Sequence, residues 1–597
     1  ENMNDDKFSD LKIANILSSV KTIAVVGASN NWKRPSNFVM KYLQRKGYKI
    51  IPVNPKEAGK EIHNELCYAS LKDIPINIDM VDVFRKSDEC LELAKDTIKI
   101  KAKVFWMQIG IFNSEANDLV LKNNLDCIYN RCPKIEHSRI FGELGSGGFY
   151  SKLISSKKNK LTNNNDNSGN FFKSNNIETL SIHAGTSPDP ITGARSFPIY
   201  QSTAFAFDDS EHAASLYNLQ ENGNIYGRLS NPTTAALEQK IAALDNAVGS
   251  CCVSSGHAAQ LIALYPLLSP GKKIVASSKL YGGSITQFTK SFKSFGWETD
   301  LVDITNYDEI KQAIKAKNVR ALFAESLSNP EGVVSDIEKL SELAHNEGIP
   351  LLIDNTMATQ AICQPANYGA DIIIYSTTKF LSGHGNAMGG CVVDAGKFDW
   401  NNGREFEKLT EPDTSYHGIK FFETFGNLAY INFCHASALR DLGTTMSPFN
   451  AYLTLTGIET LNLRMQKHMS NADEVANFLI KHDKVDSVSW SGFQKNKSYQ
   501  LAKKYFKFGF GSVFTISVKA GFDGAKKIVE NCNLFSHLAN VGDTKSLIIH
   551  PASTTHRQLN PKEREISGAG DNVIRLSIGL EHSDDIINDL KVSLDNL

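Results

Sequence analysis

Short apolar runs alternate with amphipathic segments through the first quarter of the chain. The apolar runs cover residues 22–26, 49–53, 79–84, 103–107 and 125–129. Between the first two runs, Phe38 and Tyr42 lie four residues apart, as do Val39 and Leu43, which predicts a helix over residues 37–46 with one apolar face. Ser36 is the expected N-cap of this helix. This alternation predicts a Rossmann-like, doubly wound parallel sheet of α/β class.

Two further apolar runs, both β-rich, end in charged residues. Residues 349–354 end in Asp354, and Ile372–Tyr375 lead through three hydroxyl residues to Lys379. Because burial disfavours a charged amine, a lysine at the end of a buried strand has a lowered pKa, which suits Schiff-base chemistry. A buried aspartate at a strand's carboxyl end needs a cationic partner. The alternative for Lys379 is a surface lysine after an edge strand.

The two strand ends, 25 residues apart, resemble those of the fold-type I enzymes that depend on pyridoxal phosphate (PLP). The nearest group is the Cys/Met-metabolism γ-family. This resemblance implies a large α/β domain followed by a smaller α+β domain. It also implies that Asp354 pairs with the protonated ring nitrogen of PLP and that Lys379 is the catalytic base.

Composition excludes several classes of function. Basic and acidic residues nearly balance, 64 against 65, so a nucleic-acid or membrane-surface role is not expected. Ten cysteines without the spacing of a disulfide scaffold, and a polar N-terminus without a signal-peptide pattern, favour a cytoplasmic protein with reduced thiols. Neither the cysteine pairs nor His550 and His556 have a convincing metal-ligand pattern, so no metal is expected.

The length of 597 residues requires several domains. We expect a Rossmann-like domain at residues 1–150 and a disordered Lys/Asn-rich linker at 151–176. We then expect an N-terminal arm with the large PLP-binding domain at 177–440, and a small domain at 441–597.

The N-terminal segment resembles the small stand-alone CoA-binding domain family. The resemblance is carried by Val-Gly-Ala-Ser (26–29), Arg-Pro-Ser (34–36), the run at 47–55, Val-Asp-Val-Phe-Arg-Lys-Ser (81–87), the run at 104–110 and Asn-Arg-Cys-Pro (130–133). The G-x-G-x-x-G dinucleotide fingerprint is absent. The resemblance implies CoA or acyl-CoA as a ligand with a regulatory role. The expected contacts are Ser29, Arg34 and Arg85 with the phosphates, and Gly27 and Asn54 at the strand ends.

Several loops of the second part have the residues of a phosphate site. Tyr226 and Arg228 lie in a Gly/Asn/Pro loop, and a guanidinium pairs with phosphate oxygens in bidentate fashion. Gly256 and His257 open a predicted helix, whose N-terminus favours anions. The family resemblance adds Ser376 and Thr378 to this site. It also implies that Tyr226 and Arg228 reach the phosphate of a neighbouring subunit, so the protein is expected to be a homo-oligomer, a dimer at minimum and a tetramer by family likeness.

The C-terminal third resembles the O-acetylhomoserine sulfhydrylases within the γ-family. The matching stretches are 411–418, 440–443, 535–547 and 550–556. This likeness implies replacement of acetate by sulfide or a thiol, which gives homocysteine or methionine. It places Tyr281 on the PLP ring, Glu325 and Asn329 beside cofactor and substrate, and Arg575 on the substrate carboxylate, with Ser546 next to it. The alternatives are a γ-lyase or γ-synthase on the same scaffold, and a CoA-responsive sensor.

Overall fold

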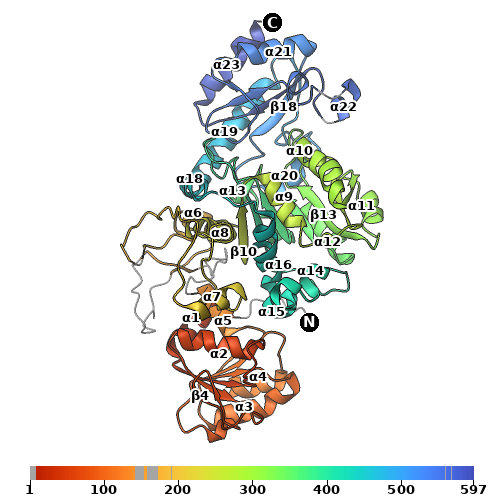
Figure 1. The fold of residues 1–597 in the computed structure, drawn as a ribbon. Helices are drawn as coiled ribbons and strands as arrows, with labels where there is room; N and C mark the ends of the chain where they lie inside the picture. Colours follow the sequence, from red (N-terminus) through yellow and green to blue (C-terminus); the bar gives the residue numbers. More distant parts are fainter. Residues whose placement is uncertain are drawn as a thin grey trace. The chain divides into compact units, whose positions relative to one another are not determined.

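The computed structural model describes residues 8–140, 153–156, 172–189, 191–557, 560–566 and 568–596. They form two compact units (Figure 1). Unit 1 comprises Glu1–Ser174, Thr186–Pro198 and Ala204–Tyr226, and unit 2 comprises Asn175–Gly185, Ile199–Thr203 and Gly227–Leu597. The chain therefore passes between the units five times.

The stretch expected to be a linker lies largely outside the described residues. Residues 157–171 are not described. On either side of them, Leu153–Ile154 (β8) pairs antiparallel with Phe172–Lys173 (β9). Three of these four residues are apolar. Their pairing joins the two ends of the polar tract by backbone hydrogen bonds.

Unit 1 is built on a parallel sheet with the order β2-β1-β5-β6-β7. Its strands are β1 (Thr22–Val26), β2 (Lys49–Val53), β5 (Met80–Val83), β6 (Val104–Met107) and β7 (Asp126–Ile128). The helices are α1 (Asp10–Ser19), α2 (Pro35–Arg45), α3 (Cys90–Lys99), α4 (Ser114–Lys122) and α5 (Pro133–Ile140). Apolar residues on the two faces of the sheet form two separate cores, which is the doubly wound arrangement predicted.

Helix α2 begins two residues before the predicted start. Its first residue is Pro35 and its N-cap is Arg34, whereas Ser36 is buried inside the first turn. Proline suits the first helical position because its fixed φ is already helical and its missing N–H has no intrahelical partner there.

Gly27 lies between the carboxyl ends of three neighbouring strands. Its φ is +91°, and its N–H donates to the carbonyl of Val53 at 2.9 Å. A Cβ added here would lie 2.6 Å from the carbonyl oxygen of Phe84. Asn54 Nδ2 donates to the Ala28 carbonyl at 2.7 Å and closes the turn. Backbone packs tightly at the edge where α/β sheets bind their ligands.

Unit 2 contains a sheet with the order β10-β16-β15-β14-β13-β11-β12. Its strands are β10 (Gly249–Val253), β11 (Lys273–Ser277), β12 (Glu298–Val302), β13 (Val319–Glu325), β14 (Leu351–Asp354), β15 (Ile372–Tyr375) and β16 (Gly390–Asp394). Strands β11 to β15 are parallel, and β16 runs antiparallel to β15 and β10. Helices α8 (Pro232–Leu244) and α9 (Gly256–Leu264) contact the β10 and β16 side of this sheet.

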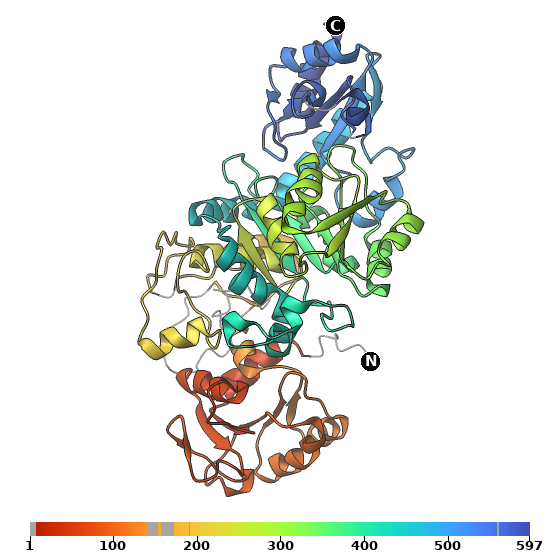
Figure 2. The ribbon, with the colours of Figure 1, turned by 45° about the vertical axis from the view of Figure 1, so that its right-hand side comes forward.

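The C-terminal part of unit 2 is a smaller, mainly antiparallel sheet. Its order is β17-β18-β21-β20-β19, with β17 at Val485–Val488, β18 at Val513–Val518, β19 at Ser536–His537, β20 at Leu547–Ile549 and β21 at Val573–Ser577. Helices α19 (Leu461–Leu479), α21 (Gly521–Asn531) and α23 (Ser583–Asp595) pack on it (Figure 2). The predicted fold class, a Rossmann-like domain plus large α/β and small α+β parts, is confirmed.

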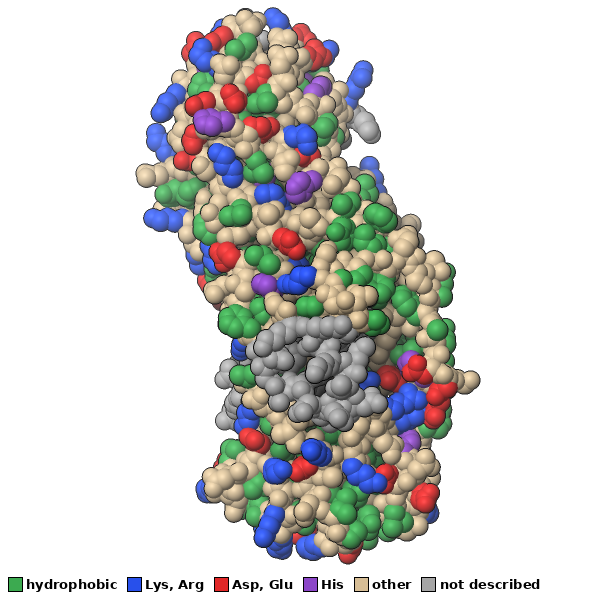
Figure 3. Space-filling model, turned by 90° about the vertical axis from the view of Figure 1, so that its left-hand side faces the viewer, with side chains coloured by type: hydrophobic (Ala, Val, Ile, Leu, Met, Phe, Trp, Pro, Cys, Tyr) green, Lys and Arg blue, Asp and Glu red, His purple; other side chains and the backbone are tan. Residues whose placement is uncertain are grey.

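Charged side chains of both signs are mixed over the face shown in Figure 3, as the balanced composition leads one to expect. None of the described helices is both long enough and apolar enough to cross a membrane.

The crowding at Gly27 predicts a difference between two glycines of unit 1. Gly59 has a similar φ, +83°, but a Cβ there meets nothing within 4 Å. Gly27→Ala should therefore destabilise unit 1 by about 2 kcal/mol more than Gly59→Ala, because both bear the strain of positive φ and only Gly27 adds a backbone clash. Hydrogen exchange of β1 and β5 amides in urea measures this loss. Equal losses in the two variants would contradict the close approach.

Candidate active site

The two charged strand ends singled out in the sequence meet at one edge of the large sheet. The β14–β15 register pairs Asp354 with Ile374, five residues before Lys379. After β15, the chain turns through Ser376, whose N–H donates to Thr356 Oγ1 at 2.8 Å. Thr356 N–H in turn donates to Asp354 Oδ1 at 3.0 Å. These hydrogen bonds tie the loop that carries Lys379 to the loop that follows Asp354.

The Lys379 amine is largely buried and faces an amide. Nζ donates to Asn540 Oδ1 at 2.6 Å. Burial and, to a smaller extent, the nearby positive charge of Arg575 together lower the pKa of Lys379 to about 8. Within the described part of the chain, no carboxylate forms an ion pair with this amine. A substantial fraction of it is therefore neutral near pH 8, as a nucleophile or base requires.

Asn540 also connects the lysine to the smaller sheet. Its backbone carbonyl accepts from Nη2 of Arg575 on β21 at 3.3 Å. Burial lowers the pKa of the Arg575 guanidinium. Asn540 was not predicted as a site residue, although it lies within the family-like stretch 535–547. Nothing in the sequence indicates that its side chain, rather than a neighbour's, reaches across to Lys379.

A pair of buried carboxyl groups lies beside the lysine loop. Glu325 and Asp354 are register partners on β13 and β14. Glu325 accepts from the N–H groups of Tyr281 at 2.7 Å and Asn329 at 3.2 Å. Burial raises the pKa of both carboxyls, and their proximity raises that of Glu325 further. Neither forms an ion pair with a Lys or Arg of the described residues. This uncompensated pair suits a cationic ring nitrogen, so the residues present fit PLP.

The start of α9 lies directly against the lysine loop. A Cβ added at Gly256 would be 2.7 Å from Cβ of Ser376. Ser255 caps the helix by accepting from the Ala258 N–H at 3.1 Å. The His257 ring lies 6.1 Å from the Tyr281 ring in an edge-to-face arrangement. The start of α9 therefore lies against the loop that carries Lys379, and a helix N-terminus is suited to bind a phosphate.

Two other predicted residues, Thr378 and Ser546, have their hydroxyl groups engaged in other contacts of the chain. The Thr378 hydroxyl accepts from the Gly389 N–H at 3.1 Å. Ser546 Oγ donates to Glu581 at 2.9 Å and accepts from the Gly579 N–H at 2.9 Å. The Asn329 Oδ1 is buried, and no described residue hydrogen bonds to it.

Arg228 is held by a segment far along the chain. Its Nη1 donates to the Arg440 carbonyl, and its own carbonyl accepts from Thr445 Oγ1 at 2.9 Å. Tyr226, the other loop residue, belongs to unit 1.

The residues expected to bind CoA lie at the carboxyl edge of the sheet in unit 1. Ser29 Oγ accepts from the Asn31 N–H at 3.2 Å, in the loop that leads to Arg34. Arg85 pairs with Glu89 at 2.7 Å, and its Cδ would be 3.2 Å from a Cβ at Gly27. The loops after β1, β2 and β5 therefore meet at one edge.

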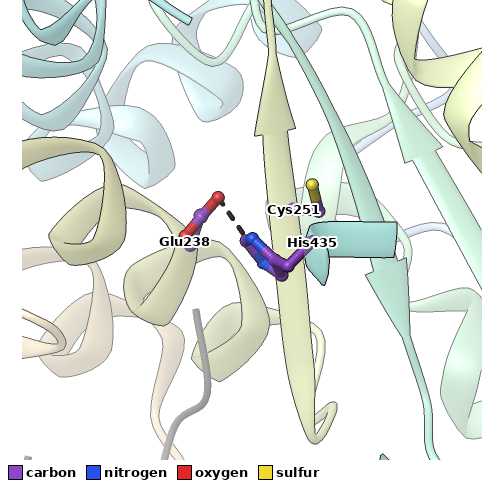
Figure 4. A group of neighbouring side chains, drawn as sticks. All are labelled: Glu238, Cys251 and His435. Carbon is purple, nitrogen blue, oxygen red and sulfur yellow. Dashed lines mark ion pairs between the residues drawn. The ribbon is translucent and has the colours of Figure 1, made fainter. Parts of the chain in front are cut away.

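A buried group of side chains that was not predicted joins α8, β10 and the segment Cys434–Leu439 (Figure 4). Glu238 accepts from the Cys252 N–H at 2.7 Å and lies 3.8 Å from His435 Nε2, which is 2.9 Å from the Ser250 carbonyl. Burial raises the pKa of Glu238 and of the neighbouring Cys251 and lowers that of His435. Their donor types suit a metal. However, Nε2 and the Glu238 carboxylate already have protein partners, which fix α8 to β10.

Comparison with known proteins matches both parts of the chain. Residues 178–595 match the family described as Cys/Met metabolism PLP-dependent enzyme, and residues 21–138 match the CoA binding domain. The O-acetyl-L-homoserine sulfhydrylase of Leptospira meyeri is 46% identical, covering 70% of this chain and 97% of that protein. The homocysteine synthase of Schizosaccharomyces pombe is 43% identical, covering 71% and 99%.

Solved structures give the same assignment. The crystal structure of an O-acetylhomoserine (thiol)-lyase from Campylobacter jejuni, which contains a pyridoxyl-lysine monophosphate, is 41% identical with a TM-score of 0.68 and covers 70% of this chain and all of that one. A cystathionine gamma synthase from Xanthomonas oryzae is 29% identical with a TM-score of 0.60, covering 70% and 98%. The chain belongs to the PLP-dependent enzymes of Cys/Met metabolism, with a CoA-binding domain at its N-terminal side.

Proposed function

We propose that this protein is an O-acetylhomoserine sulfhydrylase, which replaces the acetate of O-acetylhomoserine by sulfide or a thiol and forms homocysteine or methionine. The observation that carries the proposal is the Lys379–Asn540–Arg575 arrangement, in which an amine of lowered pKa lies next to a buried guanidinium. Relatives whose names state this activity, each covered almost completely by the chain, support the same reaction.

The phosphate of PLP is held by the start of α9, through the backbone of Gly256 and His257, together with Ser376 and Thr378. Tyr226 and Arg228 of a second copy complete this phosphate site, which makes a dimer the smallest active form and allows a tetramer. Asp354 holds the ring nitrogen, and Tyr281 covers the ring. When bound, PLP supplies an electron sink for the charge left at the substrate Cα after deprotonation.

The side chains of this chain perform the binding and the proton transfers. Arg575 binds the substrate α-carboxylate as a bidentate pair and orients Cα, with Asn329 and Ser546 near it. The neutral amine of Lys379 takes the Cα proton, and a second proton then leaves Cβ so that acetate can depart from Cγ; both protons return at the end. Tyr281 assists departure of the acetate. The Cγ–O bond breaks, a Cγ–S bond forms, and the proton of the incoming hydrogen sulfide balances the acetate released.

The proposal also covers the ligand of the N-terminal domain and the location of the protein in the cell. Residues 1–150 bind CoA or acyl-CoA through Gly27, Ser29, Arg34, Asn54 and Arg85, and have no catalytic role of their own. We place the enzyme in the cytoplasm, where its cysteines, all free in the structure, remain reduced.

The reaction is tested with the purified full-length protein. O-acetylhomoserine is supplied with and without sulfide, and homocysteine and 2-oxobutyrate are measured. We expect homocysteine only when sulfide is present. Release of 2-oxobutyrate regardless of sulfide would assign a γ-lyase instead, and absence of both products from protein loaded with PLP would favour the sensor alternative.

Replacing the proposed base should abolish turnover. Lys379→Ala is expected to lower kcat on the order of 10³-fold or more, because proton transfer at Cα loses its base. Lys408→Ala is the matched control. Lys408 is also a largely buried lysine with a pKa lowered to about 8, but its Nζ donates to the carbonyls of Tyr265 and Leu268. The assignment fails if Lys379→Ala turns over at the rate of the control.

The lowered pKa predicts the pH at which the amine becomes reactive. In the apoenzyme, acylation of Lys379 should rise with pH to a midpoint of about pH 8, because the neutral form reacts and burial favours it. Peptide mapping by mass spectrometry measures the acylation of Lys379 separately from that of the other lysines. Lys339, whose pKa is raised by Glu342, is the internal reference and should react only at higher pH. Arg575→Gln removes the neighbouring charge and should move the Lys379 midpoint upward; coincident profiles of the two lysines would contradict the burial effect.

A further inference from the structure

Unit 1 includes a segment that the family comparison assigns to the PLP enzyme. Residues 204–226, here called the acidic arm, contain α7 (Ser210–Tyr217) and belong to unit 1. The match to the PLP-dependent family begins at residue 178, and the match to the CoA-binding domain ends at residue 138. The arm is therefore a piece of the enzyme that packs within the same compact unit as the CoA-binding domain.

Ion pairs join the arm to α2. Arg45 Nη1 lies 2.7 Å from Glu221 Oε2, and Lys46 Nζ lies 3.9 Å from Glu221 Oε1. Lys41 pairs with Glu211. Gln220 Nε2 is 3.5 Å from the carbonyl of Trp32, in the loop between β1 and α2. The arm thus touches both the helix and the loop at which the CoA phosphates are proposed to bind.

The two surfaces are complementary in charge. The arm contains Asp208, Asp209, Glu211 and Glu221 but no lysine or arginine, and residues 33–46 contain five lysines and arginines but no acidic residue. The Glu221 side chain is only 10% exposed, and those of Lys41 and Arg45 are 20% and 28% exposed. Partly buried pairs are screened less than surface pairs, and removing one partner leaves a desolvated charge behind. We therefore expect the ion pairs of Glu221 with Arg45 and Lys46 to contribute to holding the arm in place.

The two ends of the arm pair with each other, and its last residue begins the loop Tyr226–Arg228, which is proposed to bind the PLP phosphate. Ala204 and Tyr226 form a β-bridge, and the Phe205 N–H donates to the Ile225 carbonyl at 3.2 Å. The next two residues are Gly227 and Arg228, and the Gly227 N–H donates to the Thr203 carbonyl at 2.7 Å. Tyr226, the last residue of the arm, is itself a proposed ligand of the PLP phosphate. A shift of the arm therefore reaches Tyr226 and Arg228 along the covalent chain, without any further contact.

We propose that the acidic arm is the element through which CoA or acyl-CoA, bound at the loop Gly27–Arg34, controls the Tyr226–Arg228 phosphate loop of the enzyme. This inference rests on the proposed function. The phosphates of the ligand bring negative charge to the basic surface that holds the arm. Ligand and arm therefore compete for the same lysine and arginine side chains. Binding coupling is reciprocal: CoA changes the affinity for PLP by the same factor by which PLP changes the affinity for CoA.

Full-length protein tests the coupling without any substrate. The dissociation constant of PLP is measured from its absorbance with and without saturating acetyl-CoA, and acetyl-CoA binding is measured by calorimetry. We expect acetyl-CoA to change the PLP dissociation constant about fivefold or more. Hydrogen exchange of residues 204–226 should change on adding acetyl-CoA, which needs no variant. An unchanged PLP dissociation constant in protein that binds acetyl-CoA would overturn the inference.

Variants test whether the acidic arm transmits the effect of acetyl-CoA on PLP binding. Glu221→Gln should reduce the acetyl-CoA effect on PLP to less than twofold while both ligands still bind. The double exchange Arg45→Glu with Glu221→Arg should restore part of it. Glu92→Gln is the matched control, because Glu92 pairs with Lys95 on α3, away from the arm, and it should leave the effect unchanged. An effect that persists at full size in Glu221→Gln would exclude the arm as the route.

The outcomes separate this inference from the proposed function. If acetyl-CoA does not bind, the inference and the CoA role fail together, whereas sulfide-dependent homocysteine formation still decides the enzymatic activity. If the protein binds acetyl-CoA and PLP with the expected coupling but forms no homocysteine, the inferred role of the arm is supported and the proposed reaction is wrong.

Discussion

The burial of ionisable groups at the carboxyl edge of β13, β14 and β15 is the constraint on which the rest of unit 2 depends. Parallel pairing puts Glu325 beside Asp354 and brings the turn to Lys379 onto the same edge. Burial acts on these groups in opposite directions: it raises the pKa of the carboxyls and lowers that of the amine. Each group is thereby shifted toward neutrality, which leaves the site ready for a charged ligand.

A second consequence of this arrangement is that two sheets share one site. Lys379 follows a strand of the large sheet and Arg575 lies on a strand of the small one, with Asn540 hydrogen bonded to both. The side chain of Asn540 contacts the amine and its backbone contacts the guanidinium. The proposed base, Lys379, and the proposed carboxylate clamp, Arg575, are therefore both held by Asn540, so their relative position depends on how the small sheet packs against the lysine loop.

Local patterns predicted the strands, the start of α9 at Gly256 and the placement of Asp354 and Lys379, because these follow from apolar runs and turn residues within a few positions. What could not be predicted depends on partners far along the chain. Asn540 reaches Lys379 across 161 residues, and His435 lies 185 residues from its Ser250 partner. The start of α2 was misplaced because Ser36 is a good cap, although the proline before it already fixes the helical φ.

The repeated passage of the chain between the two units bears on how the protein is made. During synthesis, the sheet of unit 1 is complete once β7 has emerged, but the unit's acidic arm follows only after α6 (Ile177–His183) and other residues of unit 2 have been translated. Domains generally fold from the N-terminus as they leave the ribosome. The cations of α2 thus await carboxylates that appear roughly 170 residues later. Final assembly of the N-terminal unit therefore requires that the first part of the enzyme, through residue 226, has been translated.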